Sequence, residues 1–329
     1  MTHRRLTVVV AAVALLAACR GEPKPKKRLD AGVAAAEMTG PNTKVIRAEM
    51  RSLPAPPVEL PRLDSFKLVA AGRAPRKRLR YRWVDGAARQ TIAEARVRSR
   101  RLTSGTWSPA VDSPPMREAI GVTVKAGTDG GATLYLRGVP APADAGDWAV
   151  RWRTLVENKR AEAPIDGRGL LGKVVLAEDP TGQRSGDAVA EIAQRWLTAA
   201  VPLPVEAIGK GGRWRAVTVL RAGDAVVKQT ADYTLVEAKK DAWVIDVDIR
   251  RTGEQQTVMP EGMPQGTLAE LIALFRQVKG RVTVAPDLPW PTTGTVDAEL
   301  RVHARLAVPG QPIAEQVTED IGTIAFRLE

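Results

Sequence analysis

Residues 296–306 read VDAELRVHARL, and apolar and polar residues alternate strictly along the whole stretch. Successive side chains of a β-strand point to opposite faces of the sheet, so this order places the apolar residues on one face and the charged residues on the other. Such alternation is typical of an antiparallel sheet that packs one face on a core and exposes the other to water. The stretch therefore predicts a half-buried strand.

The same two-residue period returns elsewhere in the chain after Ser65. Apolar residues take every second position in three further stretches, namely 79–83, 148–156 and 243–249. Asp85-Gly86 follows the first of them and is a tight-turn signal, because Gly adopts positive φ without a steric cost. We therefore expect a curved, mainly antiparallel sheet.

Two segments change to helical spacing, in which apolar residues recur every three or four positions. The first covers about residues 186–200 and is stopped by Pro202. The second covers residues 268–279 and begins with a capping box formed by Thr267 and Glu270. The predicted fold class is α+β, with the curved antiparallel sheet covered by two amphipathic helices.

The predicted helices also suggest how the chain is divided. Each helix follows a block of strands, and each block opens near a Trp residue, Trp83 or Trp214. This arrangement suggests a structural duplication, with one β-rich half over residues 64–203 and a second over residues 204–329. Residues 19–63 are rich in Pro, basic near their start and aperiodic, which is typical of a flexible tether.

The N-terminus has the order of a secretory signal peptide over residues 1–18. Two Arg residues precede an apolar run of 13 residues that ends at Ala18, directly before Cys19. As a helix this run reaches about 20 Å, which is less than the roughly 30 Å of a bilayer core. A permanent transmembrane helix is therefore not expected, and cleavage is predicted between Ala18 and Cys19.

The residues at this boundary, Leu16-Ala17-Ala18-Cys19, resemble the lipobox of bacterial lipoproteins. The resemblance implies a diacylglycerol thioether on Cys19, cleavage before it, and acylation of the new N-terminus by a fatty acid such as palmitate. Arg20 in the next position favours, by the same resemblance, the outer membrane facing the periplasm. The predicted location is thus the bacterial cell envelope; an ordinary signal peptide beside an incidental Cys is the alternative.

The net charge of +12 is concentrated in two windows, residues 20–28 and residues 73–101. The second window holds eleven Lys or Arg residues against two acids. Its candidate anion-binding residues form period-two rows: Arg80, Arg82, Arg96, Arg98 and Arg100. Like charges in a row repel one another, so the rows suit an anionic partner such as phospholipid headgroups, lipid A phosphates, peptidoglycan or an acidic envelope protein. A solvated strand face is the alternative, and nucleic acid is not expected because interleaved aromatic residues are few.

Catalytic chemistry has little support in this composition. One Cys and two His residues exclude zinc sites built from Cys and His, Cys-His nucleophilic pairs and disulfides. Residues 209–212, Gly-Lys-Gly-Gly, precede a predicted strand and are interpreted as a loop rather than a phosphate cradle. Asp246, Asp248 and His303 lie on polar strand faces, where exposed charged residues are ordinary. We therefore predict no enzyme, no cofactor and no metal site.

Residues 203–214, LPVEAIGKGGRW, resemble part of an uncharacterised family of large secreted bacterial lipoproteins, over about residues 79–307. That resemblance implies no known activity. The predicted function is that of a non-enzymatic, lipid-anchored envelope lipoprotein that binds or scaffolds. An alternative is a lipid or lipoprotein carrier, in which Trp148, Trp152, Trp243 and Ile245 would line an apolar cavity under a helical lid. A third hypothesis, an envelope enzyme, requires buried carboxylates near Asp246, Asp248 or His303.

Overall fold

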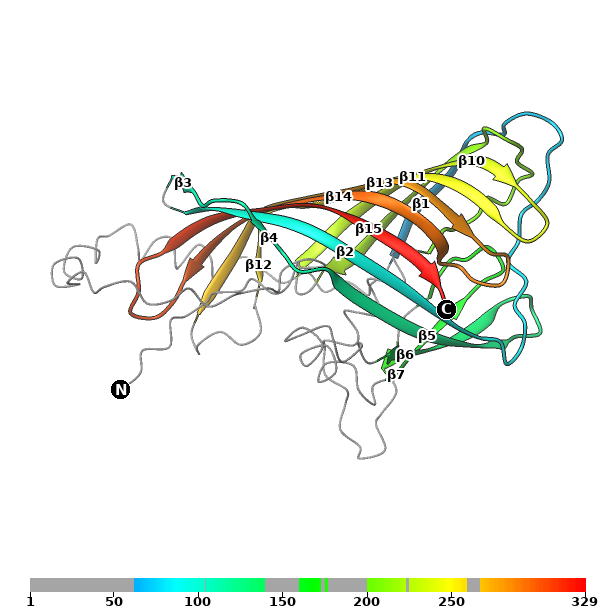
Figure 1. The fold of residues 1–329 in the computed structure, drawn as a ribbon, viewed down its shortest axis with the longest axis horizontal. Coiled ribbons are helices and arrows are strands. Elements are labelled where there is room, and N and C mark those ends of the chain that lie inside the picture. The colour runs from blue at the N-terminus through cyan, green and yellow to red at the C-terminus, as the bar shows by residue number, and fades with distance from the viewer. Residues whose placement is uncertain are drawn as a thin grey trace.

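The computed structural model describes residues 62–103, 105–139, 160–172, 175–176, 200–222, 225–258 and 267–329. Within these ranges the regular structure is entirely β-strand (Figure 1). The strands are β1 (Arg62–Ala70), β2 (Ala88–Thr103), β3 (Thr106–Trp107), β4 (Val111–Asp112), β5 (Met116–Ala126), β6 (Ala132–Val139), β7 (Arg160–Ile165), β8 (Val175–Leu176), β9 (Arg213–Ala222), β10 (Ala225–Ala238), β11 (Trp243–Gly253), β12 (Gln256–Val258), β13 (Leu268–Val284), β14 (Pro291–Ala307) and β15 (Ala314–Leu328). None of the described residues forms a helix that is long and apolar enough to cross a membrane.

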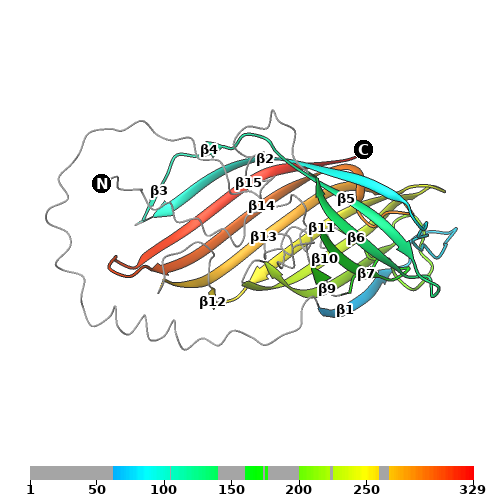
Figure 2. The ribbon, with the colours of Figure 1, turned by 90° about the horizontal axis from the view of Figure 1, so that it is seen from below.

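All the strands belong to one antiparallel sheet, whose main path is β1-β9-β10-β11-β13-β14-β15-β2-β5-β6-β7-β8; three short strands lie off this path, β12 on β13 and both β3 and β4 on β2. The sheet is long and curved, and β5, β6 and β7 curl back so that they face β9, β10 and β11 across the interior (Figures 1 and 2). The predicted boundary between residues 203 and 204 does not separate two sheets, because β1 pairs with β9 and β2 pairs with β15.

The predicted α+β class is wrong, because residues 268–279 form part of strand β13 and not a helix. Pairing between β13 and β14 shifts by one residue between Leu271 and Ala273. A bulge of this kind changes which alternate positions face the core, so the buried residues Leu271 and Leu274 stand three positions apart. The bulge therefore produced the helix-like spacing. The other predicted helix, residues 186–200, lies almost wholly outside the described residues.

Several predicted strands are confirmed where the structure describes them. Residues 243–249 lie in β11 and residues 296–306 lie in β14, each with its apolar positions facing inward. Asp85-Gly86 forms the expected turn, with Gly86 at φ 72°. Residues 79–83 are not a strand, although the burial of Leu79 and Tyr81 follows the predicted alternation. Residues 148–156 lie outside the described residues.

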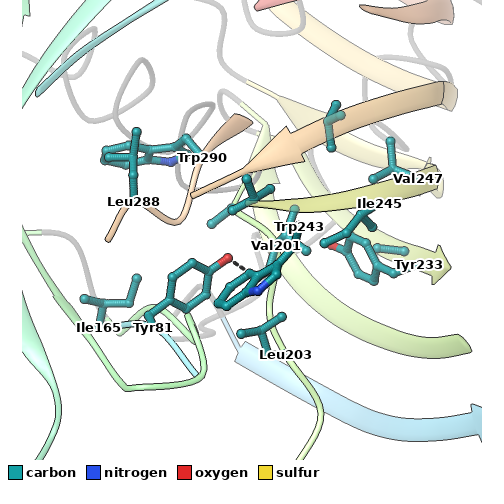
Figure 3. Packing of buried hydrophobic residues seen from close by; sticks show 14 of the residues in the cluster. Tyr81, Ile165, Val201, Leu203, Tyr233, Trp243, Ile245, Val247, Leu288 and Trp290 are labelled. Carbon is teal, nitrogen blue, oxygen red and sulfur yellow. Dashed lines mark hydrogen bonds between the residues drawn. The ribbon is translucent and has the colours of Figure 1, made fainter. Parts of the chain in front are cut away.

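The main hydrophobic core fills the space enclosed by the curled end of the sheet (Figure 3). Tyr81 packs edge-on against Trp243 with ring centroids 5.3 Å apart, and its hydroxyl donates a hydrogen bond to the carbonyl of Val201 at 2.7 Å. Trp214 stacks on Tyr233 at 5.4 Å. The first contact joins a loop to β11, and the second joins β9 to β10.

The Gly-rich residues 209–212 form the expected loop before β9. Backbone hydrogen bonds join the loop to residues 71–77. The amide of Gly209 donates to the carbonyl of Ala71 at 2.9 Å. A Cβ atom at position 209 would collide with the carbonyl oxygen of Arg73, so the close approach of the two backbones requires Gly there. The loop therefore has a packing role.

Candidate functional site

The outer face of the sheet carries several pairs of opposite charges that join neighbouring strands. Arg281 makes two hydrogen bonds to Asp246, at 2.6 and 3.0 Å, and Arg215 makes two to Asp232, at 2.7 and 3.0 Å. Exposed pairs of this kind contribute little to stability, because water and salt screen them. Their main effect is to neutralise the face.

The β2 arginines of the predicted anion-binding row take part in the same pairing. Arg98 makes two hydrogen bonds to Asp112, at 2.8 and 3.1 Å, and these hold the pKa of Asp112 below its ordinary value. Arg100 pairs with Glu319 and stacks over the Trp107 ring, while Arg96 contacts Glu94 at 3.3 Å. The three residues do lie in a period-two row on β2, but each is matched by a carboxylate.

Arg80 and Arg82 do not belong to that row, and their guanidinium groups bind backbone carbonyls. Arg80 donates to the carbonyls of Leu79, Pro204 and Val205 at 2.6–2.9 Å. Burial lowers the pKa of Arg80, and the nearby Arg168 acts in the same direction. Arg82 donates to the carbonyl of Lys240 at 3.2 Å. The two arginines thus connect loops between strands, and the five predicted residues do not converge on one site.

The polar residues considered for catalysis or calcium binding also have partners on the outer face. Besides the Arg281–Asp246 pair, Asp248 accepts hydrogen bonds from Arg250 at 3.0 Å and from Gln277 at 2.9 Å. His303 lies 2.6 Å from Glu315. Among the residues that the structure describes, no group of three or more His, Cys, Asp or Glu side chains is arranged to hold a metal ion.

The predicted cavity-lining residues separate into two pairs. Trp148 and Trp152 lie outside the described residues. Trp243 and Ile245 belong to the main core, with 3% and 0% of their surfaces exposed. Both are packed against core neighbours (Figure 3), so they do not line an open cavity.

A row of polar residues crosses the inner face at a single level of the sheet. Residues directly opposite one another on neighbouring antiparallel strands share a face, so the strand register defines the row. Leu300 of β14 lies within it, between Arg276 and Asp320. We call this set the inner polar row; in order across the sheet its members are Thr218, Gln229, Arg251, Arg276, Asp320 and Ser99.

Two arginines stand at the centre of the inner polar row. Arg251 of β11 lies directly opposite Arg276 of β13, with 9% and 8% of their surfaces exposed. The Nε of Arg251 donates to Oε1 of Gln229 at 2.7 Å, and both arginines are held by further contacts within the folded chain. Opposed like charges destabilise a sheet, and buried cations are kept only where they are paired. The strand register thus brings two buried cations, each held by contacts within the chain, to the same level of the inner face.

A buried carboxylate, Asp320, lies at the other side of Leu300. Only 1% of its surface is exposed; the Ser99 hydroxyl lies near enough to act on its carboxylate, but no hydrogen bond of ordinary geometry reaches either oxygen. Burial raises the pKa of Asp320, while Ser99 and Arg101 on β2 act in the opposite direction. A buried charge without hydrogen bonds is costly, so this position favours a proton or a cationic partner.

A second apolar cluster borders the inner polar row. Every one of its members comes from a run of neighbouring strands in the same sheet, and no described residue outside those strands joins it. The main core differs, because its residues come from facing parts of the curled sheet. The second cluster contains Leu220, Ala225, Val227, Val258, Ala269, Leu271, Leu274, Leu300, Val302, Ala304 and Leu306.

We expect Asp320→Asn to stabilise the fold at pH 7.5, because it removes a buried charge without a hydrogen bond. The gain should be about 1 kcal/mol, which raises the Tm by about 2–4 °C for a chain of this size. The raised folded-state pKa of Asp320 means that folding takes up a proton as the pH falls through that pKa. Thermal melts of both proteins should therefore converge at acidic pH. A wild-type protein that equals or exceeds the variant at pH 7.5 would contradict this account.

Sequence reasoning missed the inner polar row, although a signal was present. Arg251 occupies one of the alternate positions of β11 that face inward, like Trp243 and Ile245. Asp320 likewise falls opposite the inward residue Leu300. A charged residue at an inward position of an alternating strand is unusual and points to a buried polar group. Only the strand register shows that these charges lie at one level.

The chain matches no protein-family model, and no curated protein matches its sequence.

Proposed function

We propose that this protein is a non-enzymatic lipoprotein of the bacterial envelope, anchored through lipidated Cys19, which binds an amphipathic lipid on the inner face of its sheet. The outer membrane facing the periplasm is the location proposed. Binding is favoured over simple scaffolding because the inner face combines apolar and charged groups at one level of the sheet.

The observation that carries this proposal is the second apolar cluster beside the inner polar row. Its eleven members are buried, with 1–6% of their surfaces exposed, so a lipid could reach them only by displacing what covers this face. Acyl chains laid on this face would supply apolar contacts, while a headgroup would meet the polar row. The proposed surface is not the cavity of the carrier hypothesis, because Trp243 and Ile245 are packed in the main core and residues 268–279 form a strand and not a lid.

The test is to recover the bound lipid. The full mature chain carrying Cys19→Ala, which lacks the anchor, is purified without detergent and analysed by native mass spectrometry and lipid extraction. About one lipid per chain is expected. A clean protein mass with no extractable lipid would overturn the proposal.

A matched pair of variants locates the lipid on the protein. Ala304→Phe adds a ring on the inner face within the second cluster and should reduce bound lipid several-fold. Ile321→Phe adds a ring at an outer position that is 54% exposed and should leave bound lipid unchanged. Equal lipid in both variants would show that binding lies elsewhere.

A further inference from the structure

We propose that one end of the sheet docks on an anionic phospholipid bilayer through a surface of exposed basic loops. This inference goes beyond lipid binding on the inner face, and its surface shares no residue with that face. The choice of a bilayer as the partner rests on the proposed anchoring through Cys19. We call the surface the basic end; its members, all exposed, are Arg73, Arg76, Lys77, Arg78, Lys210, Arg213, Lys239 and Lys240.

Three segments that are far apart in sequence form the basic end. Residues 71–78 follow β1, residues 208–213 lead into β9, and residues 239–241 connect β10 to β11. All three lie at the same end of the sheet, where the blue loop after β1 stands beside the hairpin of β10 and β11 (Figures 1 and 2). Arg82, just after the first segment, donates to the carbonyl of Lys240 at 3.2 Å and so joins that part of the chain to the third segment.

Backbone hydrogen bonds hold the first two segments together. The amide of Arg73 donates to the carbonyl of Lys210 at 2.9 Å. Lys77 and Ile208 exchange two backbone hydrogen bonds, at 2.9 and 3.0 Å. The two backbones approach so closely at Gly209 that no side chain fits there. The cations are therefore presented on a fixed scaffold, and docking does not first have to order these loops.

The basic end has few carboxylates to balance its charge. Its three segments hold eight Lys or Arg residues against one acid, Asp241, and no Asp or Glu occurs in residues 65–84. Two acids flank the segments: Glu206 is exposed, and Glu237 contacts Lys239 at 3.3 Å. The surface therefore carries a net positive charge, unlike the matched Arg–Asp pairs of the outer face.

Half of these cations have side chains that are available to an anion. Within the described ranges, no hydrogen bond or ion pair reaches the side chains of Arg73, Lys77, Arg78 and Lys210. Each guanidinium carries five N–H donors and each ammonium carries three. Neighbouring like charges repel one another, so an anion that lies against them also relieves that repulsion.

A bilayer fits this surface better than a single acidic protein does. It offers many phosphates at adjustable spacing, so the cations need no exact stereochemical match. Val205, which is 51% exposed, lies beside these loops, and its carbonyl accepts a hydrogen bond from Arg80 at 2.9 Å. An apolar side chain among cations suits the boundary between headgroups and acyl chains. An anchor at Cys19 would also keep the basic end at a high local concentration beside the membrane.

Vesicle sedimentation measures this docking without the anchor. The full mature Cys19→Ala chain is mixed with vesicles of phosphatidylcholine alone or of equal amounts of phosphatidylcholine and phosphatidylglycerol, and the pelleted protein is quantified. Binding is expected only to the anionic vesicles, and high salt should release the protein because it screens the charges. Equal binding to the two kinds of vesicle would overturn the proposal.

A triple variant assigns the binding to the basic end. Each basic residue near an anionic leaflet raises partitioning about fivefold, so Arg73→Gln with Lys77→Gln and Arg78→Gln should lower it at least about tenfold. The triple variant Arg73→Lys, Lys77→Arg and Arg78→Lys preserves the charge and should bind like the wild type, which separates charge from loop structure. All these chains keep residues 20–28, whose contribution is therefore constant. Unchanged binding of the glutamine variant would refute the surface.

The matched control removes three cations from the outer face of the sheet. Lys228→Gln, Lys279→Gln and Arg301→Gln change exposed residues of β10, β13 and β14 and lower the total charge by the same amount. This variant should bind like the wild type. A loss as large as that of the basic-end variant would mean that binding follows total charge and not this surface.

Two further results keep the partner and the proposals distinct. Soluble polyglutamate that binds the chain as tightly as the anionic vesicles do, at equal negative charge, would assign the surface to an acidic protein and refute the bilayer. A Cys19→Ala chain that fractionates with membranes like the wild type, even in high salt, would refute the proposed anchoring. Vesicle binding that is lost in the glutamine variant would still support the docking surface in that case.

Discussion

Replacement of Trp214 by Ala is expected to lower the free energy of unfolding by about 3–5 kcal/mol, the usual cost of removing a buried Trp or Phe side chain. Trp214 is fully buried and lies on β9, between the edge strand β1 and strand β10. Its ring stacks on Tyr233, and its Nε1 donates to the carbonyl of Pro202 at 2.7 Å. The variant would lose packing in the main core and leave that carbonyl without its donor.

Urea denaturation followed by circular dichroism measures this loss. Trp107→Ala is the matched control, because it removes the same side chain from the short strand β3 at the margin of the sheet, where the ring stacks under Arg100. That variant should lose much less stability, about 1 kcal/mol. Similar losses in the two variants would mean that the Trp214 side chain is not a centre of the core.

Alternation in the sequence was a reliable guide wherever one face of a strand meets the core and the other meets water. Residues 243–249 and 296–306 satisfy this condition, and both are strands as predicted. Residues 268–279 misled because a bulge near Ala273 interrupts the alternation and imitates a helix. Local propensity could not correct the error, since Leu, Ala and Glu favour helices. Pairing with β11 and β14 over nearly the full length of β13 overrides that preference.

The candidate site was harder to predict than the strands. A row of charges along one strand, such as Arg96 to Arg100, is visible in the sequence, but the carboxylates that pair with it are not. Asp112 and Glu319 approach this row through turns and strand register that no local pattern encodes. For the same reason Arg251, Arg276 and Asp320, which are far apart in sequence, share one level only in the folded sheet. The sequence therefore indicated where charge lies, and the register showed which charges meet.

Replacement of Cys19 by Ala is expected to move the protein from the membrane fraction to the soluble fraction almost completely. The lipobox resemblance implies two or three acyl chains on the mature N-terminus, and each buried methylene contributes about 0.8 kcal/mol to membrane binding. The basic residues 20–28 can replace only a small part of this, since a cation near anionic headgroups is worth about 1 kcal/mol and is screened by salt.

Ultracentrifugation of lysates in low and in high salt, followed by immunoblotting, separates the two contributions. Wild-type protein should stay in the pellet in both conditions, whereas the Cys19→Ala protein should be soluble in high salt. Lys26→Gln with Lys27→Gln is the control, because it weakens the basic segment and keeps the acylated Cys; it should remain in the pellet. A Cys19→Ala protein that still sediments in high salt would mean that another part of the chain holds it to the membrane. Such a result would refute Cys19 as the sole anchor. Lipid extraction from the Cys19→Ala protein would then show whether a tightly bound lipid accompanies the retained chain.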